Sequence, residues 1–121
     1  MIRAIRGAIT IEKDTVEEVK NATVELIEEI IKRNNIDICD FAFAQFSITK
    51  DIKSATPAKF ARLNAGWHNV PMMCYNEFEF DGSLEKCIRI LIVTNSEKNQ
   101  TEIKHVYLKN AERLRPDLKN K

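Results

Sequence analysis

The stretch that decides the fold is KCIRILIVTN, Lys86 to Asn95. Its aliphatic and β-branched residues, such as Ile88, Ile90 and Ile92, are typical of a buried strand. Arg89 interrupts this apolar run with a guanidinium group that stays protonated and has five donors and no acceptor. Because an unpaired buried cation is costly, an anion must meet Arg89. The stretch therefore predicts a buried strand with an anion site, filled by a carboxylate of the protein or by a ligand.

The rest of the chain predicts an α+β fold, with a mostly antiparallel or mixed sheet of about five strands packed with one long helix. Either Asp14 or Thr15 caps that helix, with Glu17 or Glu18 completing a capping box. Asp81-Gly82-Ser83 is a hairpin or short-loop signal. We expect strands at 2–11, 40–49, 72–80 and 103–108, the long helix at 14–35, a short helix at 56–66, and a helical turn at 109–114.

One face of the predicted sheet is left without a cover. Strand alternation puts Cys87, Arg89, Leu91 and Val93 on the same face, and residues 40–48 are apolar on both faces. One long helix covers only one side of a sheet, and a small domain seldom exposes such an apolar patch. We therefore predict a homo-oligomer that buries this face between subunits.

Composition narrows the class of protein. With 121 residues, the chain is expected to form a single domain over 1–121, with a polar C-terminal tail after about residue 116. Nineteen Lys and Arg balance 18 Asp and Glu, so the net charge of +1 favours neither nucleic acid nor a membrane surface as partner. No apolar run approaches the roughly 18 residues of a membrane span. Three cysteines without a CxxC pair fit a reduced cytoplasm.

The familiar catalytic motifs are missing from the sequence. It has no glycine-rich phosphate loop, no HExxH and no GxSxG, and neither histidine has a metal-ligand partner at useful spacing, so we expect no metal site. The strand arginines Arg6 and Arg89, with Glu77 nearby, instead outline a cationic pocket for a small anion. Lys59 and Arg62 share one helix face. Structural ion pairs and solvated surface charges remain the alternative for each cation.

Four segments resemble a known family over nearly the whole chain. They are IRAIRGAITIEKDT, PAKFAR, VPMMCYNEFEFDGSLEKCIRIL and IKHVYLKNAERLRPDL, and they resemble the AroH class of chorismate mutase. The resemblance implies a cytoplasmic homotrimer with an α+β pseudo-barrel and active sites between neighbouring subunits. It also implies conversion of chorismate to prephenate, in the shikimate route to phenylalanine and tyrosine, without a cofactor.

The resemblance gives individual residues roles. Arg89 matches the arginine that meets the ether oxygen and a carboxylate of the substrate, and Glu77 with Cys74 matches the pair near the ring hydroxyl. Arg6 and Tyr107 match the residues that hold the other carboxylate. The remaining matches are Met73, Tyr75 and Asn76 along the pocket, Lys59 and Arg62 on a flexible stretch at its mouth, and Leu114 and Arg115 on a closing C-terminal tail.

The sequence departs from the family pattern at a few positions. Thr56 stands where some members carry phenylalanine, Met73 stands where a smaller residue is common, and the tail ends soon after Asp117. These differences concern the pocket mouth. Cys74 and Glu77 are three residues apart, so an ideal strand would point them to opposite faces, and the strand must bulge or end between them.

The chemistry implied by the resemblance suits these residues. A pericyclic rearrangement needs no nucleophile and no proton transfer, only a fixed substrate conformation and a cation beside the ether oxygen. One alternative is a Rid-type imine deaminase with a similar trimeric fold, against which the CYNEFEF and HVYLKNAERLRPDL segments argue. Another is a non-catalytic trimer that binds a small carboxylate, against which the joint presence of Arg6, Glu77, Arg89 and Tyr107 argues.

Overall fold

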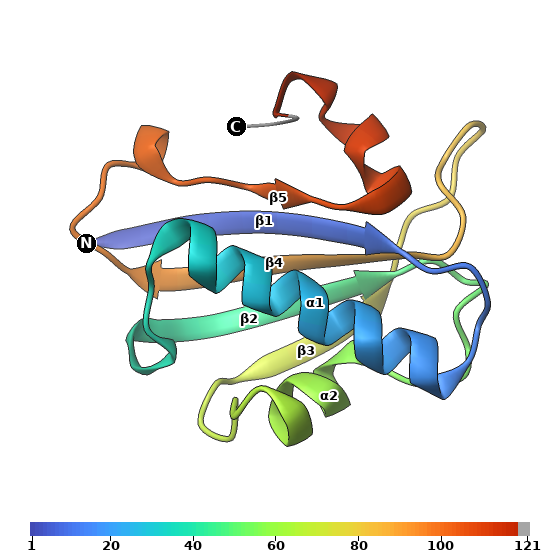
Figure 1. The fold of residues 1–121 in the computed structure, drawn as a ribbon, viewed down its shortest axis with the longest axis horizontal. Coiled ribbons are helices and arrows are strands. Elements are labelled where there is room, and N and C mark those ends of the chain that lie inside the picture. The colour runs from blue at the N-terminus through green and yellow to red at the C-terminus, as the bar shows by residue number, and fades with distance from the viewer. Residues whose placement is uncertain (119–121) are drawn as a thin grey trace.

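A computed structural model describes residues 1–118 of the protein as a five-stranded sheet with two helices (Figure 1). Residues 119–121, the end of the predicted polar tail, lie outside the described residues. The elements are β1 (Ile2–Thr10), α1 (Val16–Asn34), β2 (Phe41–Ile48), α2 (Pro57–Asn64), β3 (Met72–Asn76), β4 (Cys87–Asn95) and β5 (Val106–Tyr107). Short 3-10 turns lie at Ile38–Asp40, Gln100–Glu102, Lys109–Leu114 and Pro116–Leu118.

The stretch of residues 86–95 forms β4, the middle strand of the sheet. The strand order is β3-β2-β4-β1-β5. β4 runs antiparallel to β1 and to β2, whereas the outer pairs, β2 with β3 and β1 with β5, are parallel. The predicted α+β fold with a mixed sheet is therefore confirmed.

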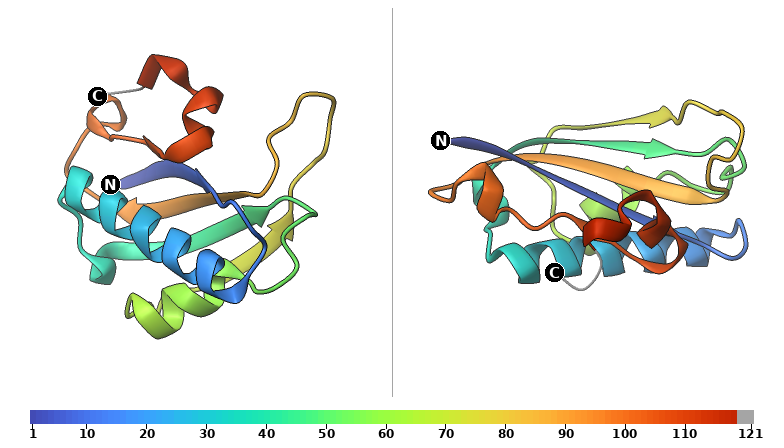
Figure 2. Two further views of the ribbon diagram at one scale, coloured as in Figure 1. Left: turned by 45° about the vertical axis from the view of Figure 1, so that its right-hand side comes forward. Right: turned by 90° about the horizontal axis from the view of Figure 1, so that it is seen from above.

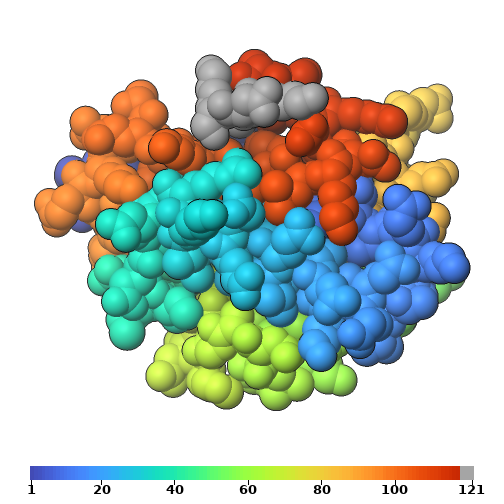
Figure 3. All heavy atoms as spheres, in the orientation of Figure 1, coloured from blue at the N-terminus to red at the C-terminus, as the bar shows by residue number. Residues whose placement is uncertain are grey.

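Both helices pack on the same face of the sheet, which they hide in the view of Figure 3 (Figures 1 and 3). Thr15 caps the start of α1, since its hydroxyl accepts the backbone N–H of Glu18 at 3.1 Å, and α1 is followed by Asn35 in the left-handed conformation. This hydrogen bond gives a partner to a backbone N–H that has none within the helix, and it fixes where α1 starts. The central core side chains, all less than 5% exposed, are Ile5, Ile9, Leu26, Ile27, Ile30, Phe46, Ala61, Trp67, Ile88, Ile90 and Ile92.

The predicted strand at 72–80 is too long, and the predicted hairpin between it and residues 86–95 is wrong. β3 ends at Asn76 and pairs with β2, which lies between β3 and β4. The reason is that β2 itself ends at Ile48, whose carbonyl accepts the N–H of Glu77 at 2.7 Å. Residues 77–86 then form a projecting loop, in which the exposed rings of Phe78 and Phe80 stack on each other (Figure 2, left).

The opposite face of the sheet has no helix on it (Figure 2, right). A corner of it is covered by the C-terminal turn Lys109–Leu114, where Ala111 is fully buried with Ala8 and Cys87. The rest carries exposed apolar side chains, among them Phe43 and Met73. The helices within residues 1–118 are all too short or too polar to cross a membrane.

Candidate active site

Arg89 and Glu77 meet on the helix-free face. Strand register places Arg89 beside Ala8 of β1 and Ser47 of β2. The guanidinium Nε lies 3.6 Å from Oε1 of Glu77, close enough for an ion pair but too long for a hydrogen bond. That Nε atom is buried and has no hydrogen-bond partner within residues 1–118. The carboxylate of Glu77 thus balances the charge of Arg89 while a donor stays free for another acceptor.

A shallow pocket of about 200 Å³ lies beside this pair. It brings together two guanidinium groups from neighbouring strands, since Arg6 and Arg89 both contribute to it. The phenol of Tyr75 stands at its side and donates to the sulfur of Met73 at 3.3 Å. The lining residues are Arg6, Gln45, Phe46, Ser47, Tyr75, Arg89, Ile90 and Leu91. Such a surface is suited to an anion with more than one acceptor group.

The C-terminal segment borders the site from the β1 side. Tyr107 pairs with Ala8 in the strand register and packs, with Leu114, on the cluster around Ala8. Just before it, Nδ1 of His105 accepts the backbone N–H of Arg6 at 2.9 Å. Burial lowers the pKa of His105, and the cations Arg6 and Arg115 lower it further. The segment therefore ties Arg6 to its position on the edge of the sheet.

Arg115 lies in the same C-terminal segment. Its guanidinium pairs with the carboxylate of Asp117 at 2.9 Å, and this hydrogen bond raises the pKa of Arg115. An arginine held by a near neighbour in the chain is only partly available to a second anion. Within one chain, Arg115 is thus a border residue of the site rather than part of its centre.

Four of the predicted site residues lie on the helix side of the sheet, away from this pocket within one chain: Cys74, Asn76, Lys59 and Arg62. Cys74 pairs with Phe46 in register and packs against the main core, on the helix side of the sheet. Lys59 and Arg62 are exposed on α2, which covers that same side. Asn76 pairs with Ile48, so it also belongs to the helix side, whereas Met73 and Tyr75 share the face of Arg89.

The expected break between Cys74 and Glu77 is confirmed, because β3 ends at Asn76 and frees Glu77 to turn toward Arg89. Sequence reasoning missed two polar residues of the pocket, Ser47 and Gln45, besides its apolar wall. Gln45 and Ser47 are two residues apart in the strand predicted at 40–49, so they share one face. Only the register shows that Ser47 stands opposite Arg89 and Gln45 opposite Leu91. Cys87 lies at the covered corner, where burial raises the pKa of its thiol to about 11.

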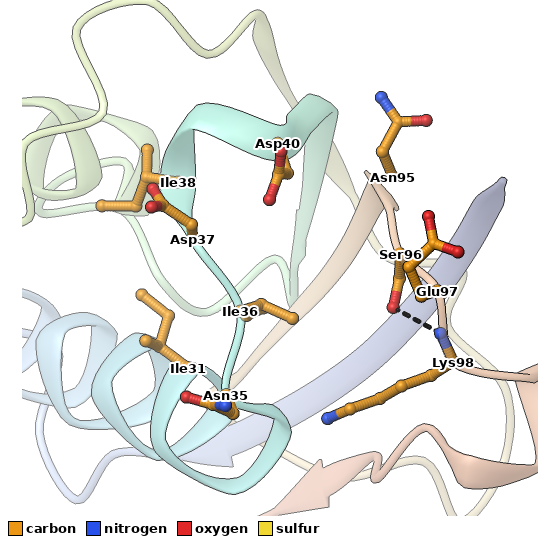
Figure 4. Close-up of a pocket in the computed structure, with 10 residues that line it drawn as sticks. All are labelled: Ile31, Asn35, Ile36, Asp37, Ile38, Asp40, Asn95, Ser96, Glu97 and Lys98. Atoms are coloured by element: carbon orange, nitrogen blue, oxygen red, sulfur yellow. Dashed lines mark hydrogen bonds between the residues drawn. The ribbon is translucent and has the colours of Figure 1, made fainter.

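A larger hollow of about 630 Å³ lies at the other end of the molecule, near the C-terminus of α1 (Figure 4). Its walls carry the carboxylates of Asp37, Asp40 and Glu97, as Figure 4 shows. The ammonium group of Lys98 already donates to the carbonyl of Asn34. An anion would be repelled there, so this hollow does not compete with the site around Arg89. No three His, Cys, Asp or Glu side chains in residues 1–118 are grouped so that they could hold a metal ion.

The fold and the site define an α+β protein whose open sheet face carries a cationic pocket for a small organic anion. Comparison with known families gives the class more narrowly, since the family described as "Chorismate mutase type I" matches residues 2–118. The chain belongs to the chorismate mutase type I family.

Individual relatives agree over almost the full length. "Chorismate mutase AroH" of Bacillus subtilis (strain 168) is 42% identical over 118 residues, which are 98% of this chain and 93% of the relative. The protein of the same name from Thermus thermophilus is 43% identical over 121 residues, 99% of this chain and 98% of the relative. A solved chorismate mutase from Clostridium thermocellum is 42% identical and superposes with a TM-score of 0.87, over 90% of this chain and 96% of that one.

Proposed function

We propose that the protein converts chorismate to prephenate by an intramolecular rearrangement, as its family membership and the cationic pocket support. The single observation that carries the mechanism is the buried Nε of Arg89, which has no hydrogen-bond partner within the described residues although Glu77 lies 3.6 Å away. A donor fixed in a partly buried site and left open is what a substrate oxygen needs.

Arg89 and Glu77 have complementary roles in this proposal. As the ether bond of chorismate stretches, negative charge grows on its oxygen, and the guanidinium of Arg89 stabilises that charge. Arg6 and Tyr107 hold a carboxylate, which fixes the enolpyruvyl group over the ring in a near-attack conformation. Glu77 accepts from the ring hydroxyl and complements the positive character left on the ring. Orientation and charge are the whole of the catalysis, so no proton needs to be exchanged with the protein.

We also propose that the active form is a homotrimer with sites between subunits. A pocket of about 200 Å³ is below the roughly 300–1,000 Å³ usual for small-molecule sites. Within one chain Lys59 and Arg62 stand on the helix side of the sheet, away from Arg89. A neighbouring subunit seated on the open face would enlarge the pocket and bring such residues to its mouth. Each chain would act as a single catalytic domain, in the reduced cytoplasm where its cysteines stay unpaired.

The decisive experiment is to follow chorismate loss by absorbance and prephenate formation by its acid-catalysed conversion to phenylpyruvate. Purified protein is expected to give saturable turnover that heat denaturation abolishes. A correctly folded protein that binds chorismate without turnover would favour the non-catalytic carboxylate-binding trimer. A protein that instead hydrolyses imines would favour the deaminase alternative.

A further inference from the structure

Ser47 is a polar side chain of the pocket that touches Glu77, and the preceding mechanism gives it no role. It stands on β2, in register with Arg89 of β4 on one side and Tyr75 of β3 on the other. All three side chains therefore leave the sheet on the same face. Ser47 is half-buried and lines the same pocket as both arginines.

The hydroxyl of Ser47 donates a hydrogen bond to Oε2 of Glu77. The other oxygen of that carboxylate, Oε1, faces Nε of Arg89 at 3.6 Å. Glu77 lies beyond the end of β3, where its N–H to the carbonyl of Ile48, at 2.7 Å, is the last backbone bond to β2. Its side chain thus stands at the start of a projecting loop, and Ser47 ties one of its oxygens to the rigid centre of the sheet.

The two oxygens of the Glu77 carboxylate therefore have different partners, Ser47 for Oε2 and Arg89 for Oε1. A carboxylate free to rotate would move its oxygen a few tenths of an ångström and form a direct charge-assisted hydrogen bond with the guanidinium. In the structure, Oε1 of Glu77 stays 3.6 Å from Nε of Arg89, which has no hydrogen-bond partner in the described part of the chain. Glu77 therefore balances the charge of Arg89 without occupying its donor.

We propose that Ser47 is a positioning residue, which holds Glu77 away from Arg89 and so keeps the arginine donor open for the substrate's ether oxygen. The inference rests on the proposed chorismate mutase activity. It assigns Ser47 no contact with the reacting atoms, only control over the carboxylate beside them. A hydrogen bond to a charged group lost from such a site corresponds to roughly a 10- to 100-fold change in rate.

The test is Ser47→Ala, which removes the hydroxyl and leaves room rather than strain. We expect kcat to fall about 10- to 100-fold with the melting temperature within a few degrees of wild type. Ser47→Thr keeps the hydroxyl on a residue suited to a strand and should recover most of the rate. Ser96→Ala is the matched control, because the Ser96 hydroxyl accepts the N–H of Lys98 outside the pocket, and it should keep the wild-type rate.

A double-mutant cycle separates positioning from a general structural effect. If Ser47 acts through Glu77, adding Ser47→Ala to Glu77→Gln should cost less than threefold more, whereas independent effects would multiply. Wild-type kcat in Ser47→Ala, or an equal loss in both backgrounds, would overturn the proposal. Failure of the proposed function looks different, because the wild-type protein itself would then not turn over chorismate.

Discussion

At the scale of single residues, Arg89 is a cation in an apolar strand, and in the structure its side chain is partly exposed. Its side chain is 38% exposed and that of Glu77 is 24% exposed, so the ion pair between them is partly solvated. A pair of this kind stabilises a fold by about 0–1 kcal/mol. Stability therefore does not explain why an arginine stands in the middle of β4, whereas the proposed binding of an anionic substrate would.

We predict that Arg89→Lys lowers kcat far more than it raises KM. Lysine keeps the charge, but it is a compact point donor that cannot serve a carboxylate and an ether oxygen with the geometry of a planar fork. An interaction made mainly in the transition state shows up in kcat. A loss of about a thousandfold would correspond to roughly 4 kcal/mol of barrier, at about 1.4 kcal/mol per factor of ten.

Melting temperature, measured beside kcat and KM, should change little in Arg89→Lys. The matched control is Arg33→Lys, which alters an arginine paired with Glu29 at 2.7 Å on α1, remote from the pocket. It should leave kcat and KM as in wild type. Near-normal kcat in Arg89→Lys, together with a collapsed melting temperature, would mean that Arg89 is a structural residue.

At the scale of elements, β5 is a very short edge strand held mainly by its ends. Only Val106 and Tyr107 pair with β1. The backbone of β1 adds two bonds, from Arg6 N–H to His105 Nδ1 at 2.9 Å and from Leu108 N–H to the carbonyl of Ala8 at 2.9 Å. The position of the C-terminal segment therefore depends on His105 staying neutral, since a protonated ring cannot accept that bond.

This dependence predicts an acid-sensitive docking of β5. The pKa of His105 is lowered in the fold, by burial first and by Arg6 and Arg115 after it, from a value of about 6.5 in an unfolded chain. The unfolded chain therefore takes up the proton first as pH falls. The contribution of His105 to stability is complete above about pH 6.5 and is lost as pH falls from there through the lower folded-state pKa.

His105→Asn tests the prediction, because asparagine offers an acceptor at a similar position and does not titrate. Urea unfolding at several pH values between 5 and 8, at one protein concentration, should show a shallower acid slope in His105→Asn than in wild type. The protection factors of amides 106–108, which are exchange rates corrected for their intrinsic pH dependence, should fall below pH 6.5 in wild type only. Equal slopes in the two proteins would contradict the role of His105.

The contact between α1 and the sheet depends on Gly7 of β1. A Cβ added there would lie 2.8 Å from Cδ1 of Ile30 and 3.1 Å from the carbonyl oxygen of Val106. Both are closer than ordinary packing allows, so the glycine lets α1 and β5 approach the strand together. This is the close backbone approach for which a glycine inside a strand is used.

We predict that Gly7→Ala lowers the free energy of unfolding by about 1–3 kcal/mol, as overpacking of a filled core does. Adding Ile30→Val removes the Cδ1 atom and should recover part of that loss, leaving the part due to the Val106 carbonyl. Urea denaturation of wild type, each single variant and the double variant measures both terms. If Gly7→Ala proves as stable as wild type, the close approach of α1 is not what limits this position.

At the scale of the whole molecule, the open sheet face predicts assembly. Leu91 and Val93 are only partly covered, and Phe43 and Met73 are exposed on the same face. We predict that the protein is a trimer by light scattering at micromolar concentration. Val93→Glu, which lies outside the pocket between Ala4 and Phe43, should shift the mass toward a monomer and abolish turnover, because a carboxylate in a buried apolar interface has no partner there.

Val16→Glu is the control for that experiment. Val16 is 50% exposed in the first turn of α1, where a carboxylate suits the helix dipole, so the trimer and its activity should both persist. A wild-type protein that is monomeric yet fully active would refute both the assembly and the shared site.

The sequence by itself determined the class of fold, the buried apolar strand at 86–95 and the arginine that carries charge into it. Local signals sufficed there, because β-branched runs, the cap at Thr15 and the proline at 57 each fix their own element. The resemblance to the family could also be recognised from the sequence, because the segments that carry it are continuous stretches of the chain.

Only the tertiary structure decided which strands pair with one another and which side chains therefore meet. β3 pairs with β2 rather than with β4, and no local pattern encodes which strand accepts which N–H. The end of β2 at Ile48 stops β3 at Asn76, and this turns Glu77 toward Arg89 while Cys74 stays in the core. Ser47 likewise became part of the site only through its register with Arg89. Register is set by side-chain packing across strands far apart in the chain, so it exists only in the folded sheet.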